Sequence, residues 1–431
     1  MKKLLYGLFF FTALASHAQD NIYPAPKQQG VIVISNGTIH VGNGQVIENG
    51  SIVIKDGKIQ SVGKDAQNIA GATVINASGK KVYPGLILAK TDLGLKEIGA
   101  AVRGSNDYNE LGEYNTDIKS VVAYNTDSKF INTLRSNGIL LANIVPDGNL
   151  LTGTTSVVQL DAWNWEDAIY QADNAISFNM PRLMQSMRRF SFGPPSTSNP
   201  LTEGYKNIDA VKDFFASAQA YIKSGAPKET NLKFEALRPL FEKKQKLFIN
   251  ADIARQILAA IDIAKTFNID VVIVGGSDSY LYASLLKENN IPVILNEMHA
   301  LPTLEDDDVD QPYKTPAALQ KAGVLFAIND SHDNSRYRNL AFNAGTASAY
   351  GLTKEQALQA ITLNAAKIIG IDKRTGSIEA GKDANIIIST GDILDMNQSN
   401  VTDAFIQGRK INLSNKHTQL YDRYMHRYNL K

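Results

Sequence analysis

The sequence predicts an α/β fold in which two β-rich segments enclose a long central region. The first segment, residues 31–62, combines strand patterns with turn dipeptides. The second segment, residues 376–388, combines a glycine turn with a buried strand. In the central region, apolar strand runs alternate with helical patterns, as a (β/α) arrangement requires.

The first β-rich segment contains hairpin signals. Residues 31–34 form an apolar run, and Asn49-Gly50 and Asp56-Gly57 are dipeptides that favour tight hairpin turns. Residues 51–55 and 58–62 flank the second dipeptide, and we expect them to pair as strands.

The central region contains the signals for a series of strands and helices. Buried strands are predicted at residues 139–145, 246–249, 271–274 and 324–328, and helices at residues 253–267 and 279–288. Thr353 and Gln356 have the spacing of a capping box that opens a further helix. Residues 193–206 are rich in Pro, Ser and Gly, which indicates a loop within a longer insertion at about 180–240.

The N-terminus has the pattern of a secretory signal peptide. Met1-Lys2-Lys3 is basic, residues 4–15 are apolar, and Ser16-His17-Ala18 supplies small residues for cleavage after Ala18. We therefore expect residues 1–18 to be removed and the protein to be exported, either to a periplasm or out of the cell.

Composition excludes several classes of function. The 431 residues are long enough for a large domain and a smaller one. The net charge of +1 gives no electrostatic basis for binding nucleic acid. After the N-terminal segment, no run of 18 or more apolar residues predicts a membrane span. The sequence has no cysteine, so disulfides and thiolate metal sites are excluded.

Three motifs resemble one enzyme family. Residues 84–92 read Pro-Gly-Leu-Ile-Leu-Ala-Lys-Thr-Asp, residues 362–366 read Thr-Leu-Asn-Ala-Ala, and residues 376–388 read Gly-Ser-Ile-Glu-Ala-Gly-Lys-Asp-Ala-Asn-Ile-Ile-Ile. They resemble the amidohydrolase superfamily, most closely its imidazolonepropionase-like and prolidase-like branch. The resemblance implies a TIM (β/α)8 barrel over residues 84–374 and a small β-sandwich built from residues 25–83 and 375–413, followed by a tail at 414–431.

The resemblance also implies a reaction. Members of the superfamily hydrolyse amide, ring-amide or related C–N bonds at the C-terminal mouth of the barrel. One or two metal ions lower the pKa of a bound water and polarise the carbonyl group. A barrel aspartate then accepts the proton.

The family's metal-ligand positions hold other residues in this sequence. The family's first barrel strand ends Asp-Ala-His-x-His, with both histidines on one side of the strand. Lys90 and Asp92 stand in their places. Two later strand ends that carry histidines in the family carry Asn250 and Gly275 here. Asp330 stands where the family places its catalytic aspartate.

The remaining candidate ligands allow two hypotheses. His299 and His332 lie near predicted strand ends, and each follows a carboxylate by two residues, Glu297 and Asp330 respectively. With Asp92 they would form an unusual site for a single zinc ion. The alternative is that they are hydrogen-bonded polar residues at the barrel mouth and that no metal is bound. The loss of all the family's histidine positions favours the alternative.

Lys90 also has two interpretations. Its ammonium could pair with Asp92 and occupy the volume of the lost metal, which would keep Asp92 and Asp330 from repelling each other. Alternatively, a desolvated lysine of lowered pKa could act as a base or as a Schiff-base nucleophile. A lysine beside carboxylates is expected to have a raised pKa, which favours the first interpretation.

Two functions follow from these interpretations. The first is an exported hydrolase of non-peptide or small-peptide C–N bonds with a degenerate metal centre. The second is a non-catalytic protein that binds a small molecule or small peptide at the barrel mouth, or that forms a homo- or hetero-oligomer with an active amidohydrolase. Function depends on the site rather than on the fold, and the replaced ligands favour the second.

Overall fold

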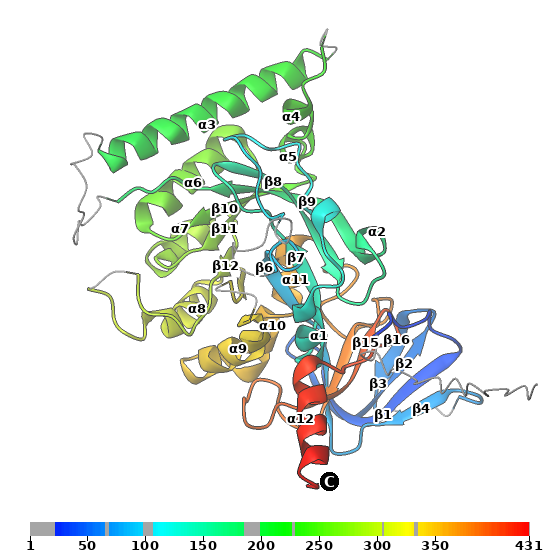
Figure 1. Ribbon diagram of the computed structural model, residues 1–431. Helices are drawn as coiled ribbons and strands as arrows, with labels where there is room; N and C mark the ends of the chain where they lie inside the picture. The colour runs from blue at the N-terminus through cyan, green and yellow to red at the C-terminus, as the bar shows by residue number, and fades with distance from the viewer. Residues whose placement is uncertain are drawn as a thin grey trace, which may run out of the picture.

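The computed structural model describes residues 22–64, 69–97, 107–184, 199–225, 229–303, 306–331 and 335–430. A barrel-shaped sheet and a second sheet organise these residues (Figure 1). The predicted signal segment, residues 1–18, lies outside them. Within the described ranges, no helix combines the length and the apolar character that crossing a bilayer demands.

The barrel-shaped sheet contains eight strands in the order β13-β12-β11-β10-β9-β8-β7-β6. Its strands are β6 (Leu86–Thr91), β7 (Ile139–Ile144), β8 (Leu151–Gln159), β9 (Ile169–Asn179), β10 (Lys246–Ala251), β11 (Val271–Gly275), β12 (Val293–Leu295) and β13 (Phe326–Ile328). The sheet is nearly closed, so the predicted barrel fold is confirmed.

One strand departs from an all-parallel barrel. Strand β8 runs antiparallel to both β7 and β9, whereas the other neighbouring strands are parallel. The connection from β7 to β8 spans only residues 145–150. A parallel pair needs a crossover of about a dozen residues or more, so this short connection permits only a reversal of direction.

The barrel is completed between β6 and β13 without a backbone ladder. Helix α11 (Leu363–Ile369) packs against both strands, and the backbone N–H of Ile87 donates to the carbonyl of Ile361. Nearer the C-terminal edge, the side chain of Asn329 bonds to the backbone of Lys90 on β6. Side-chain bonds therefore replace strand pairing at this seam.

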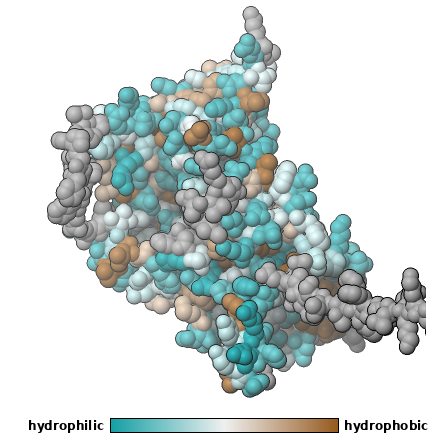
Figure 2. Space-filling model, viewed as in Figure 1, coloured by the Kyte–Doolittle hydropathy of each residue, from teal (hydrophilic) through white to brown (hydrophobic). Residues whose placement is uncertain are grey.

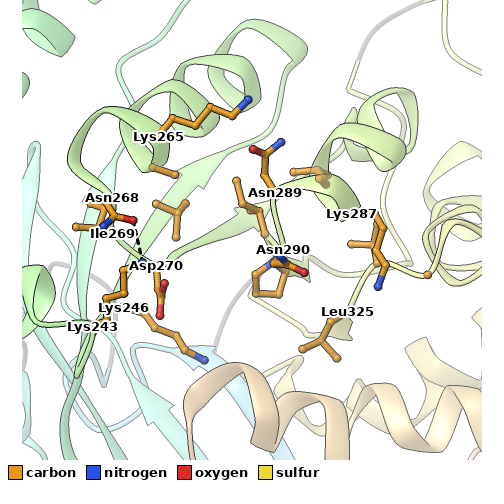
Figure 3. Close-up of a pocket in the computed structure, with 17 residues that line it drawn as sticks. Lys243, Lys246, Lys265, Asn268, Ile269, Asp270, Lys287, Asn289, Asn290 and Leu325 are labelled. Carbon is orange, nitrogen blue, oxygen red and sulfur yellow. Dashed lines mark hydrogen bonds between the residues drawn. The ribbon is translucent and has the colours of Figure 1, made fainter.

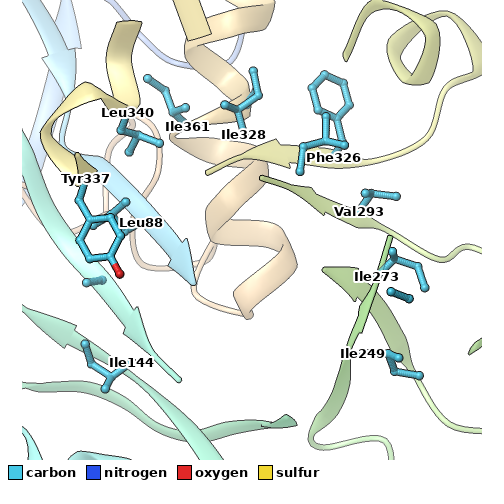
Figure 4. Close-up of a cluster of buried hydrophobic side chains, with 14 of the residues drawn as sticks. Leu88, Ile144, Ile249, Ile273, Val293, Phe326, Ile328, Tyr337, Leu340 and Ile361 are labelled. Carbon is cyan, nitrogen blue, oxygen red and sulfur yellow. The ribbon is translucent and has the colours of Figure 1, made fainter. Parts of the chain in front are cut away.

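The barrel strands bury both faces, as their continuous apolar runs require. Phe248, Val272 and Ile294 face the barrel interior together with residues of α11. The alternate residues, such as Ile249 and Ile273, belong to the large core between the strands and the outer helices (Figure 4).

The outer helices follow the strands around the barrel (Figure 1). They are α1 (Lys129–Ser136), α6 (Ala254–Phe267), α7 (Ala283–Glu288), α8 (Gln311–Ala322), α9 (Leu340–Ala349) and α10 (Lys354–Ala360), with a short α2 (Trp165–Ala168) and the 3-10 turns η1 (Ser120–Ala123), η2 (Ser279–Tyr282) and η3 (Tyr337–Asn339). The predicted capping box opens α10, because Thr353 and Gln356 exchange side-chain bonds with each other's backbone N–H.

The second sheet joins the two ends of the described chain. Its strands are β1 (Val31–His40), β2 (Val46–Lys55), β3 (Lys58–Gly63), β4 (Thr73–Asn76), β5 (Lys81–Pro84), β14 (Ile386–Ser389), β15 (Val401–Ile406) and β16 (Arg409–Lys410). Strand β14 pairs antiparallel with β5, which brings Ile386 opposite Pro84. The predicted joining of N- and C-terminal segments in one β structure is therefore confirmed.

One predicted hairpin turn is wrong. Asp56-Gly57 does connect β2 to β3, but Asn49-Gly50 lies inside β2 at an irregularity of the β1–β2 pair. A Cβ atom on Gly50 would lie 2.5 Å from Cδ1 of Ile39, so this glycine permits a close approach of two strands rather than a turn.

A buried ionic cluster ties the second sheet to the barrel. Asp161 is fully buried and accepts hydrogen bonds from the guanidinium groups of Arg135 on α1 and Arg409 on β16. It also accepts from the backbone N–H of Ala25 at 2.8 Å. A charge buried in this way is stable only while its partners are present.

Two segments extend beyond this core. The expected insertion contains α3 (Pro200–Lys223), α4 (Leu232–Glu235) and α5 (Arg238–Phe241), and the expected C-terminal tail contains helix α12 (Lys416–Arg427). On the face shown in Figure 2, the described surface is mainly hydrophilic and its apolar residues are scattered.

Candidate functional site

Lys90 reaches the barrel mouth from an irregular position in β6. The register of β6 against β7 shifts between Leu88 and Thr91, which is the signature of a bulge. Asn143 on β7 donates to the Ala89 carbonyl at 3.1 Å. On the other side, Asn329 donates to the Lys90 carbonyl at 2.9 Å and accepts from the Lys90 N–H at 3.3 Å. Asparagine side chains from both neighbours therefore fix the backbone that presents Lys90.

Carboxylates from four strand ends surround Lys90. Asp92 follows β6, Asp147 follows β7, Asp252 follows β10 and Glu297 follows β12. Each of them attracts the Lys90 ammonium electrostatically. We call Asp92, Asp147, Asp252 and Glu297 the mouth carboxylates. They meet because the carboxyl ends of parallel barrel strands open at one face.

The pKa of Lys90 is lowered, and burial is the main cause. The mouth carboxylates oppose this effect but do not cancel it. The expectation of a raised pKa is therefore wrong, because loss of hydration outweighs attraction to carboxylates that lie at a distance. The expected direct pairing is also wrong: these two described side chains, Lys90 and Asp92, form no ion pair within 4.0 Å.

Asp92 has a different partner. The hydroxyl of Tyr337, in η3, donates to Oδ1 of Asp92 at 2.5 Å. Tyr337 is buried, and burial together with the charge of Asp92 raises the pKa of its hydroxyl. The tyrosine therefore stays protonated and holds the carboxylate in place.

Asn250 is engaged in an amide chain along the mouth. Its Nδ2 donates to Oδ1 of Asn179 at 2.6 Å, and Nδ2 of Asn179 donates to the carbonyl of Gly148 at 2.8 Å. The amide that replaces a family histidine thus bridges β10 to β9 and to the loop after β7.

Gly275 makes room for a carboxylate from the neighbouring strand. Its φ is +96°, and a Cβ atom at this position would lie 2.2 Å from Oδ1 of Asp252. Asp252 therefore fills the space into which a side chain at position 275 would project. Ser277 donates to the same oxygen at 3.3 Å. Burial raises the pKa of Asp252, while Ser277 and Lys90 oppose the shift.

The aspartate at the end of β13 is held by an amide rather than left open to the mouth. Asp330 is fully buried and accepts from Nδ2 of Asn343 on α9 at 3.0 Å. The Oδ1 of Asn343 in turn accepts from the backbone N–H groups of Met298 and His299. Asn343 therefore connects two strand ends to the outer helix layer.

Glu297 and His299 bond to different parts of the structure. Glu297 accepts from the hydroxyl and backbone N–H of Ser331 at 3.3 and 3.4 Å, beside the mouth. The His299 ring instead bonds to the hydroxyl of Thr346 on α9 at 2.7 Å. Burial and the nearby Arg336 lower the pKa of His299, so it stays neutral. His332 lies outside the described residues.

The donor set does not fit the metal centre that the resemblance implies. Zinc takes imidazole, thiolate or carboxylate ligands. The family's ligand positions instead hold a lysine, an aspartate bonded to Tyr337, an amide bonded to Asn179, and a glycine covered by Asp252. Among the residues that the structure describes, no group of three or more His, Asp or Glu side chains could hold a metal ion.

A small cavity adjoins the mouth carboxylates. Its volume is about 230 Å³, and Asp252, Gly275 and Glu297 are among the residues that line it. The rest of the lining is mixed: apolar residues such as Leu295 and Met298 stand beside polar ones such as Asn296 and Gln311. Small-molecule sites usually have mainly apolar walls with a few polar groups, so this cavity is more polar than most of them.

A larger cleft lies at the opposite end of the barrel strands, and its lysines have structural roles. Its volume is about 610 Å³, and Lys243, Lys246, Lys265 and Lys287 line it (Figure 3). Lys246 donates to the final carbonyls of α11, and Lys265 and Lys287 lie in the last turns of α6 and α7. Such lysines complement the negative ends of helices.

Several residues of the mouth were not predicted from the sequence. These residues are Asp147, Asp252, Tyr337, Asn143, Asn329 and Asn343. Asn329 directly follows the predicted strand 324–328, so its position was a usable signal, whereas Asp252 directly follows β10 only as the structure extends it, to Ala251. Tyr337 and Asn343 come from the segment after β13, and only the tertiary structure brings them to the mouth.

Comparisons with known proteins agree with this architecture. A family model described as "Amidohydrolase family" matches residues 333–411. The chain is 24% identical over 378 residues to an imidazolonepropionase of Thermoplasma volcanium, a match that covers 83% of this chain and 89% of that protein. It is 28% identical over 194 residues to an imidazolonepropionase of Picrophilus torridus, which covers 44% of this chain and only 45% of that protein.

Solved structures extend the likeness to the whole described fold. An amidohydrolase from Thermotoga maritima superimposes with a TM-score of 0.76 at 25% identity, covering 88% of this chain and 99% of that one. A prolidase complexed with N-methylphosphonate-L-proline superimposes with a TM-score of 0.54 at 14% identity, covering 89% of this chain and 100% of that one, and supports the fold alone. Taken with the barrel, the second sheet and the motifs at the strand ends, these matches show that the chain belongs to the amidohydrolase superfamily.

Proposed function

We propose that this protein is an exported member of the superfamily that binds a small molecule or a small peptide at its barrel mouth without a catalytic metal. The observation that carries the proposal is the position of Lys90. This cationic side chain stands among the mouth carboxylates, at a strand position where the family carries a metal ligand.

Charge balance supports this proposal. Several carboxylates in one partly dehydrated mouth repel one another unless a cation lies among them. In the superfamily a metal ion would supply that positive charge. Here Lys90 supplies one positive charge from within the chain, and Asp252 occupies the volume above Gly275. Lys90 thus makes up for the missing charge of the metal ion, and Asp252 fills the volume that is left at position 275.

The cavity beside Glu297 supports the binding part of the proposal. Its volume of about 230 Å³ is below the roughly 300–1,000 Å³ that is typical of sites for drug-sized ligands. A ligand of this site is therefore a compact molecule. The proposal also includes a complex in which this protein is the partner subunit of an active amidohydrolase. A partner subunit of that kind keeps the fold of the family but does not need the metal ligands.

The second candidate is a hydrolase of amide or small-peptide C–N bonds that uses a single divalent metal. One observation favours it: Asp330 is retained at the end of β13, where the family has its catalytic aspartate. Its carboxylate is fully buried and bonded to Asn343.

Metal analysis of the purified mature protein tests the two candidates. We expect far less than one equivalent of zinc, cobalt or manganese by mass spectrometry, before and after metal is added back and excess is removed. Asp330→Ala and Asp92→Ala should leave that content unchanged. The exposed Asp262, which pairs with Lys212 outside the mouth, provides the matched control Asp262→Ala.

The opposite result would refute the proposal. One equivalent of bound metal that is lost in Asp330→Ala but retained in Asp262→Ala would establish a metallohydrolase. Cell fractionation tests the export: an uncleaved chain that still carries residues 1–18 and is found only in the cytoplasm would refute that part.

A further inference from the structure

Helix α12, the red helix of Figure 1, is amphipathic, and no residue of it is buried. Leu420, Tyr424 and the C-cap residue Tyr428 follow one another at intervals of four residues, so they lie on one side of the helix. Tyr421 and Met425 lie beside them, and we call these five residues the aromatic face of α12. Tyr424 and Tyr428 are 52% and 65% exposed, and their rings stack with centroids 6.3 Å apart. Much of the aromatic face is therefore in contact with solvent.

A row of cations borders the aromatic face. Lys416, Arg423 and Arg427 are separated by seven and four residues, which places them together on one side of the helix. We call these three residues the cationic row; all are exposed, and within the part of the chain that the structure describes none pairs with a carboxylate within 4.0 Å. Cζ of Arg423 lies 6.0 Å from the centroid of the Tyr424 ring, so the cationic row and the aromatic face meet. The one acidic residue of α12 is Asp422, and α12 therefore carries a net positive charge.

We propose that α12 docks the protein onto an anionic phospholipid surface. The aromatic face lies at the level of the lipid headgroups, and the cationic row faces the lipid phosphates. Helices that bind in the plane of a membrane surface combine an apolar or aromatic face with Lys and Arg on the polar side. Tyrosine suits this position because its ring is apolar while its hydroxyl stays hydrated. The surface lies outside the barrel, so the proposal does not depend on what the mouth binds.

Size and charge disfavour a second copy of the chain as the occupant. The 12 residues of α12, at about 1.5 Å each, make a helix about 18 Å long and about 10 Å wide, with a footprint of roughly 180 Å². A stable protein interface buries about 800 Å² on each partner. If α12 met its own copy in a two-fold pair, the two cationic rows would also come together. A lipid surface needs no minimum area of this kind and carries the opposite charge.

The first turn of α12 is fixed to the barrel, so the helix is already formed when it meets the membrane. Oδ1 of Asn415 accepts from the backbone N–H groups of His417 and Thr418 at 2.8 and 3.1 Å. Nδ2 of Asn415 donates to Oγ of Ser136, at the end of α1, at 2.9 Å. An isolated helix of fewer than about 12–15 residues is only marginally stable in water. The cap and the attachment to α1 therefore reduce the ordering cost of binding.

Sedimentation with lipid vesicles tests the proposal on the mature protein. Vesicles of phosphatidylcholine alone are compared with vesicles that contain phosphatidylglycerol as a minor component. We expect at least about tenfold stronger partitioning into the anionic vesicles at low salt, since each Lys or Arg near such a surface changes partitioning about fivefold. Most of this difference should disappear at about 1 M salt, where the range of electrostatic attraction falls to about 3 Å.

Two matched double variants locate the binding surface. Arg423→Gln/Arg427→Gln removes two charges from the cationic row and should weaken partitioning into the anionic vesicles about 25-fold, at about fivefold for each charge. Lys265→Gln/Lys287→Gln removes the same charge from exposed positions on α6 and α7, and should leave partitioning within about twofold of the wild type, because charges beyond a Debye length from the membrane are screened. Circular dichroism verifies that both variants keep the fold.

A single label reports which side of α12 meets the lipid. The chain has no cysteine, so Tyr424→Cys provides a unique site for an environment-sensitive dye on the aromatic face. His426→Cys provides a matched site on the opposite side, because two residues along a helix correspond to a rotation of about 200°. Anionic vesicles should shift the emission of the dye at position 424 to shorter wavelength and leave that at position 426 unchanged.

Several results would overturn the proposal. These are an absence of partitioning into anionic vesicles, equal partitioning into both kinds of vesicle, and partitioning that Arg423→Gln/Arg427→Gln leaves unchanged. Sedimentation equilibrium examines the competing occupant: a dimer that dissociates when Tyr424 and Tyr428 are replaced by serine would assign the aromatic face to a second copy. Metal analysis concerns the mouth alone, so the proposed function and this inference stand or fall separately.

Discussion

Replacing Asn329 by alanine is expected to weaken the barrel at the seam where no strands pair. Asn329 is fully buried, and its side chain is bonded to both the N–H and the carbonyl of Lys90, at 3.3 and 2.9 Å. The variant leaves these two backbone groups without that partner. An unsatisfied buried polar group costs about 1–3 kcal/mol. Because the 3.3 Å bond is long and therefore weak, we expect a total loss of about 2–4 kcal/mol.

Urea unfolding followed by circular dichroism measures this loss, and amide hydrogen exchange at Lys90 localises it. The control is Asn289→Ala, which removes a single bond to the carbonyl of Leu285 from a half-buried position at the end of α7. It should cost about 1 kcal/mol or less. If Asn329→Ala unfolds within about 0.5 kcal/mol of the wild type, the spread expected for surface substitutions, the assignment of the seam to Asn329 is wrong.

Three further predictions concern the mouth and its connection to the second sheet. Because burial lowers the pKa of Lys90, the unfolded chain binds more protons than the folded protein as pH approaches 10.5. The wild type should therefore gain stability relative to Lys90→Met as pH rises, by at most about 1.4 kcal/mol per pH unit. Urea unfolding at pH 7, 8.5 and 10 measures this trend, and the opposite trend would contradict the prediction. Gly275→Ala should cost about 2–4 kcal/mol of stability, because position 275 has a positive φ and a Cβ there contacts Asp252. In a double-mutant cycle, adding Asp252→Ala should recover the portion of the loss that comes from this contact; strictly additive losses would argue against the contact. Asp161→Ala should cost about 3–5 kcal/mol, because it leaves the buried guanidinium of Arg135 and the half-buried one of Arg409 without their carboxylate. Thermal unfolding should show this loss, with Lys212→Gln as the neutral control.

The sequence predicted the elements whose signals are local. Strands β7, β10, β11 and β13 and helix α6 lie where their apolar patterns placed them. The Thr353–Gln356 capping box formed as expected, because its bonds join residues three positions apart. The positions of Lys90, Asn250 and Gly275 at strand ends also followed, since a motif counted along one strand fixes where that strand ends.

Contacts between segments that are distant in the sequence were not predicted. Strand β8 was not predicted, and its reversed direction follows from a short connection within an otherwise parallel sheet. Asn49-Gly50 has the composition of a turn but lies inside a strand, because pairing with β1 outweighs its local preference. Asn329 and Asn343 were not singled out, because an asparagine in a sequence carries no sign of the backbone group that it will bond.

By itself, the sequence determined that this chain is an α/β barrel with a β-rich unit formed from both ends, and that the family's metal ligands are missing from it. These conclusions depend on periodicity and on the resemblance of three motifs to the amidohydrolase superfamily. Only the tertiary structure decided what replaced the metal ligands. Asp252, from the neighbouring strand, fills the space above Gly275. Tyr337, rather than Lys90, is the hydrogen-bond partner of Asp92. Burial lowers the pKa of Lys90. The reason is physical: the sign of a pKa shift and the partner of a carboxylate depend on distances and on dehydration, which exist only after the chain has folded.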